Sequence, residues 1–211
     1  MCNCMNRGCS GCSGHGWQPC GNQCFSLGPF RAASAKCPTP NVGSIIPFSS
    51  GTVPVILTTT AGVAATVSAV GFGTAITGLA VSATTPPTIT LPDGDGQTEA
   101  FSVPRNGRIT AISATFTPTA DLAAFTGTGV ITAQIYRAPA GSSTFTATNA
   151  FVNLTPTITG PAIAGTVFSG TVDMVNVPVA AGDRLVMVFS LAGGTDATTL
   201  TGAATAGITI S

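Results

Sequence analysis

The chain has 211 residues, of which 7% are charged, against about 25% in ordinary globular domains. Its seven basic and seven acidic residues give a net charge of zero, and its mean hydropathy is +0.47. No basic run is present that could neutralise several phosphates, so the sequence predicts no nucleic-acid partner. A surface with so little charge favours association between chains.

Residues 1–44 are rich in Gly, Ser, Pro and Cys, lack hydrophobic periodicity, and are interpreted as an N-terminal arm. The arm also holds the sole His and the sole Trp of the chain and three basic residues without an acid. We expect neither a secretory signal nor a membrane span, because no run has the required apolar core. All seven cysteines lie here: Cys2, Cys4, Cys9, Cys12, Cys20, Cys24 and Cys37.

The odd number of arm cysteines predicts disulfides, with at least one thiol left free or linked to another chain. The alternative is a zinc site with thiolate ligands, in which His15 could replace one cysteine. A Gly/Ser setting does not favour thiol redox catalysis, which needs a helix start to lower a thiol pKa. Trp17 is interpreted either as an anchor against a neighbouring subunit or as a packing residue within the arm. The four zinc candidates are Cys9, Cys12, Cys20 and Cys24.

Residues 45–211 are interpreted as one all-β head domain, an antiparallel sandwich. Segments rich in Val, Ile, Thr and Phe are separated there by Gly and Pro, and no segment has a capped helical stripe. The predicted strands are 45–48, 53–60, 64–71, 74–81, 98–103, 108–117, 129–136, 150–154, 166–177, 184–190 and 203–211.

Two strands of the head carry specific predictions. Ile109 is out of phase with the alternating set that begins at Ile112, which predicts a β-bulge near Ala111. A second strand is apolar on both faces, so one face needs a cover beyond a single sandwich. We expect a subunit contact to supply that cover. The residues of this predicted trimer or core contact are Leu185, Val186, Met187, Val188 and Phe189.

The charged residues of the head offer few chemical sites. Asp93, Asp95 and Glu99 could bind calcium through alternate carboxylates, but the Pro-Asp-Gly-Asp-Gly run is equally typical of a turn between strands, which we favour. Asp183 and Arg184 are interpreted as a charge pair at a turn before the apolar strand. A hydrolase triad needs a His that the head lacks, and seven scattered acids do not favour a glycosidase. We therefore expect no enzyme, no catalytic residue and no cofactor.

In chain order, the head resembles the C-terminal domain of Bcl-type exosporium glycoproteins of spore-forming bacilli. The pieces that carry the resemblance are IIPFSSG at 45–51, VGFG at 70–73, FSVPRNG at 101–107, ITAISA at 109–114, TAQIYR at 132–137, AGDRLVMVF at 181–189 and AGITI at 206–210. The resemblance implies a jelly roll of the complement and tumour-necrosis-factor kind, assembled as a trimer. The collagen stalk usual in that family is replaced here by the Cys-rich arm.

The residues and the resemblance together predict a self-assembling structural protein of the bacterial spore surface, in the exosporium or an appendage fibre. Its partners would be further copies of itself and other spore-surface proteins, without nucleic acid or membrane. Synthesis in the mother cell without a signal peptide, followed by lysis of that cell, would expose the arm to oxidising conditions. The alternative function is a spore-surface adhesin, in which the arm tethers a complement-like head that binds a ligand.

Overall fold

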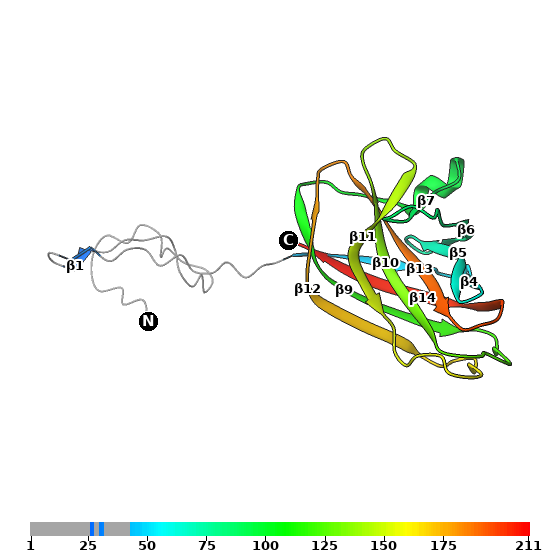
Figure 1. Cartoon of the computed structure of the whole chain (residues 1–211). Coiled ribbons are helices and arrows are strands. Elements are labelled where there is room, and N and C mark those ends of the chain that lie inside the picture. The colour runs from blue at the N-terminus through cyan, green and yellow to red at the C-terminus, as the bar shows by residue number, and fades with distance from the viewer. Residues whose placement is uncertain (1–25, 28–29, 32–42) are drawn as a thin grey trace. The chain divides into compact units, whose positions relative to one another are not determined.

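A computed structural model of the chain describes residues 26–27, 30–31 and 43–211. The chain divides into two units, residues 1–42 and residues 43–211. In the first unit, β1 (Ser26–Leu27) pairs antiparallel with β2 (Phe30–Arg31). The second unit is the head (Figure 1).

The described part of the head consists of strands and one short 3₁₀ helix. Its first half contains β3 (Ser44–Ser49), β4 (Val55–Thr60), β5 (Val63–Val70), β6 (Ala75–Ala80), β7 (Thr88–Thr90), η1 (Gly94–Glu99) and β8 (Phe101–Ser102). Its second half contains β9 (Gly107–Pro118), β10 (Gly129–Ala138), β11 (Thr144–Asn153), β12 (Phe168–Val179), β13 (Arg184–Gly193) and β14 (Thr198–Ile210).

The strands pack as two antiparallel layers of a jelly-roll sandwich. One layer has the order β12-β9-β14, with β3 and β4 paired one after the other along the far edge of β14. The other layer has the order β5-β13-β10-β11-β7, and β4 joins the two layers because it pairs with both β14 and β5. The prediction of an all-β antiparallel sandwich is therefore confirmed.

Most of the predicted strands are present, and the differences are local. Residues 98–99 belong to η1 rather than to a strand, β7 has no counterpart among the predicted strands, and β11 begins at Thr144 instead of residue 150. The predicted bulge is confirmed next to Ala111: Ala111 pairs with Thr209 and Ile109 pairs with Ile210, which leaves Thr110 as the extra residue. The bulge shifts the alternation by one, so Ile109 and Ile112 are both fully buried.

Two hydrophobic cores stabilise the head. The larger core lies between the layers and contains Phe48, Phe116 and Phe189 among its fully buried side chains. The smaller core lies on the other face of the β5-β13-β10-β11 layer, where β6 and β7 contribute Leu79 and Ile89. In Figure 1, β6 and β7 lie at the side of the head away from β12.

Candidate functional site

Strand β13 is the central strand of the second layer and is buried on both faces. Leu185, Met187 and Phe189 point into the larger core, whereas Val186 and Val188 point into the smaller one. The sequence analysis expected a neighbouring subunit to cover the second face. The structure corrects this expectation, because residues of β5, β6, β7, β10 and β11 from the same chain supply the cover.

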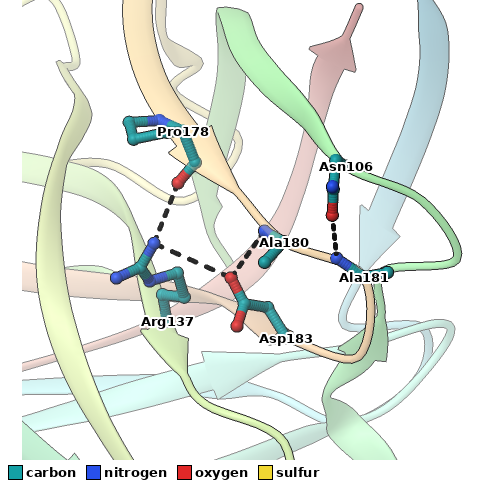
Figure 2. Close-up of polar contacts among 6 residues, drawn as sticks. All are labelled: Asn106, Arg137, Pro178, Ala180, Ala181 and Asp183. Atoms are coloured by element: carbon teal, nitrogen blue, oxygen red, sulfur yellow. Dashed lines mark hydrogen bonds and ion pairs between the residues drawn. The ribbon is translucent and has the colours of Figure 1, made fainter.

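The turn between β12 and β13 is held by polar contacts from Arg137 of β10 and from Asn106, which lies just before β9 (Figure 2). Asp183 Oδ2 accepts a hydrogen bond of 2.8 Å from the Ala180 amide and lies 3.7 Å from Arg137 Nη1. Arg137 Nη1 also donates to the Pro178 carbonyl at 2.9 Å, and Asn106 Oδ1 accepts from the Ala181 amide at 2.8 Å. The expected turn is present, but the charge partner of Asp183 is Arg137, which lies far from it in the sequence.

Arg184 has a different role from the predicted rim pair. Its Nη1 donates to Gln97 Oε1 at 2.7 Å, and its Nη2 donates to the Gln97 carbonyl at 2.6 Å. Its guanidinium carbon also lies 5.3 Å from the centre of the Phe145 ring, a cation–π arrangement. Arg184 therefore ties η1 and β11 to the central strand.

The three calcium candidates lie in or beside η1, and at least two of them differ in their exposure to solvent. Asp93 is exposed, whereas Glu99 is 3% exposed. The side chain of Asp95 lies outside the described residues. Within the described part of the chain, no three His, Cys, Asp or Glu residues gather as metal ligands.

Glu99 is buried against the turn between β5 and β6. Burial raises the pKa of its carboxyl above the ordinary value of 4.5, and hydrogen bonds with the Thr74 side chain and the Gly71 backbone oppose this rise. Its Oε2 has no hydrogen-bond partner. A Cβ on Gly71 would collide with this carboxylate, so the close approach requires a glycine there.

A groove lies along the seam between β11 and β12. Just beyond the end of β11, Thr155 forms an isolated bridge with Ser169 of β12, whose two backbone hydrogen bonds measure 2.8 and 2.9 Å. Beyond that bridge lies a cavity of about 640 Å³, within the range of roughly 300–1,000 Å³ that is typical of ligand sites. Three exposed apolar side chains line it: Phe151, Val172 and Met174.

The groove continues into a second cavity of about 600 Å³. Asn149, Asn176 and Val177 line both cavities, and Arg137 lines the second. Arg108 Nη1 of β9 donates to Asn176 Oδ1 at 2.6 Å, a hydrogen bond that holds a residue shared by the two cavities.

Both walls of the groove contain a β-bulge. In β12, residues 174–176 lie opposite the single residue Thr110 of β9, and in β11, residues 148–150 lie opposite Ile135 of β10. Met174 has a φ of 67° and is 95% exposed. Bulges often lie next to functional sites, where they redirect a side chain.

Sequence reasoning missed this groove, although one signal was present. The spacing from Val172 to Val175 is three residues, whereas Val175, Val177 and Val179 alternate. Such a slip of phase indicates a bulge.

The cysteine, zinc and Trp17 predictions lie outside the described residues. In the described part, no helix is long and apolar enough to cross a membrane.

The chain is similar to a curated protein of the Acanthamoeba polyphaga mimivirus called Collagen-like protein 1. The two are 31% identical over 160 residues, which cover 71% of this chain and 16% of the viral protein. The chain thus spans about a sixth of the length of that relative. No family model and no solved structure matches the chain.

Proposed function

We propose that the chain is a self-assembling structural protein of the bacterial spore surface, a subunit of the exosporium or of an appendage fibre. In this proposal a trimeric head is linked to its neighbours through disulfides of the N-terminal arm. The observation that carries it is the separation of all seven cysteines from a head that folds around its own cores without any.

Two further observations support a structural role. The similarity to a collagen-like protein agrees with the resemblance of the head to exosporium glycoproteins. The outer face of the β12-β9-β14-β3 layer also carries small, uncharged residues, which allow close approach of another copy. Two cross-strand rows on this face are Thr171, Ser113, Gly207 and Pro47, and Ser169, Thr115, Thr205 and Ser49.

The test compares the full chain with a variant that lacks residues 1–37. The full chain should give ladders on a non-reducing gel and filaments by negative-stain microscopy. The truncated chain should give only discrete heads, because the deletion removes every cysteine and no strand of the head. Undiminished assembly of the truncated chain would contradict the connector role of the arm.

The second candidate function is a spore-surface adhesin, and the groove between β11 and β12 is the observation that favours it. Discrete particles from the full chain under oxidising conditions, with no ladder and no filaments, would support the adhesin over the fibre subunit.

A further inference from the structure

The two walls of the groove between β11 and β12 are strand edges. Strand β12 pairs only with β9 among the described strands, and the part of β11 beyond Ala147 pairs only with β10. A strand edge presents backbone N–H and C=O groups that can hydrogen-bond to an added extended peptide. The Thr148 and Pro178 carbonyls beside the second cavity already accept hydrogen bonds from Gln134 and Arg137. The walls of the first cavity are therefore the part that suits a peptide strand.

The exposed apolar side chains that line the first cavity define what that peptide must carry. Phe151 is 45% exposed, Val172 is 37% exposed and Met174 is 95% exposed. An extended segment with apolar residues at alternate positions would place them on one face, against these three side chains.

The N-terminal arm contains such a segment. Phe25 and Leu27 lie at alternate positions around Ser26, and Gly28 and Pro29 end this alternation. The β1–β2 ladder in this segment has only two residue pairs, which is marginal by itself. The arm has no acidic residue, so none of its side chains repels Asp173 of β12.

The length of the arm allows it to reach another copy. The linker of residues 32–42 separates β2 from the head and spans at most roughly 36–40 Å when extended. A compact domain of this size has a radius of gyration of about 15 Å, so this reach is comparable to the width of a head.

We propose that the segment 25–27 of one copy binds as an added strand in the β11–β12 groove of a neighbouring copy. This inference rests on the proposed function, because it names the contact through which the arm joins two heads. Cys24, next to Phe25, would then lie at the groove and be available for covalent linkage.

The experiment uses a cysteine placed in the groove of the full chain, since the head has none of its own. Met174→Cys is the test variant, and Thr60→Cys is a matched exposed control at the end of β4. Chains labelled with ¹⁵N are mixed with unlabelled chains, oxidised, and digested with trypsin. The expected product is a disulfide between the tryptic peptides 8–31 and 138–184, which contain Cys24 and position 174.

Binding of the segment would raise the local concentration of Cys24 at the groove, so this link should exceed that of the Thr60→Cys control by about fivefold or more. Labelled and unlabelled peptides should be mixed in it, and fragmentation should place the bond at Cys24. Leu27→Asp should abolish the excess, whereas Ser34→Asp, which adds the same charge elsewhere in the arm, should preserve it.

Three results would overturn the proposal: equal cross-linking of the two cysteine variants, links only within single chains, or bonds spread evenly over the cysteines of peptide 8–31. Filaments that persist in any of these cases would leave the proposed function standing.

Discussion

At the scale of single residues, Glu99 gives a prediction on pH. Its pKa is raised by burial, so the folded head binds this proton more tightly than the unfolded chain does. The stability that comes from protonation is therefore present at low pH. It is lost as the pH rises from the unfolded value of about 4.5 through the folded pKa.

Glu99→Gln imitates the protonated carboxyl and should remove this loss. We expect the variant to be more stable than the natural chain at pH 7 and the difference to shrink toward pH 4, as measured by urea unfolding. Asp173→Asn is the matched control, because it removes an exposed carboxylate and should change the stability at pH 7 little. A constant difference between Glu99→Gln and the natural chain from pH 4 to pH 8 would contradict the argument.

At the scale of elements, we predict that the second face of β13 is part of the core of a single chain. Val188 is 1% exposed and lies in the smaller core. Val188→Asp would bury an unpaired carboxylate, which costs about 4 kcal/mol or more of the free energy of unfolding. We expect loss of the cooperative melting transition in circular dichroism.

Val63→Asp is the control for this substitution, because Val63 is 68% exposed. That variant should melt close to the natural chain. If Val188→Asp instead melted normally but had a smaller mass by light scattering, the second face of β13 would be a subunit contact.

The sequence could predict β13 as buried on both faces, because five consecutive apolar residues carry that information. It could not show what covers the second face, because the cover comes from β6, β7 and other distant segments. The same limit applies to side-chain partners. The pairing of Arg137 with Asp183 depends on the register between strands, and no local pattern encodes it.

The alternation of apolar and polar residues along a strand predicted more than it could for side-chain partners, because it indicates where a β-bulge lies. The slip between Ile109 and Ile112 correctly predicts a bulge in β9, and a comparable slip at Val172 marks the bulge in β12. Strand β7 was missed because it has only three residues and stands between prolines. Short strands of this kind form through tertiary contacts, which outweigh local propensity.

At the scale of the whole molecule, the proposed function assigns different roles in assembly to the arm and the head. The head is a unit with its own cores, and in this proposal the seven cysteines of the arm supply the thiols that link it to other copies. A disulfide that joins chains or closes a long loop typically adds about 2–4 kcal/mol. Assemblies of the full chain should therefore resist heat and denaturant better without reductant than with it.

The rival chemistry is zinc bound by Cys9, Cys12, Cys20 and Cys24, and it predicts the opposite sensitivities. Thiolate ligands would keep the cysteines reduced, release zinc on acidification, and make the assembly sensitive to chelators. We expect the assembly to withstand a chelator and to dissociate with reductant. Mass spectrometry of non-reduced peptides should find cross-linked arm cysteines. Recovery of every arm cysteine as a free thiol, together with stoichiometric release of zinc, would contradict the disulfide connector and support an arm that binds zinc.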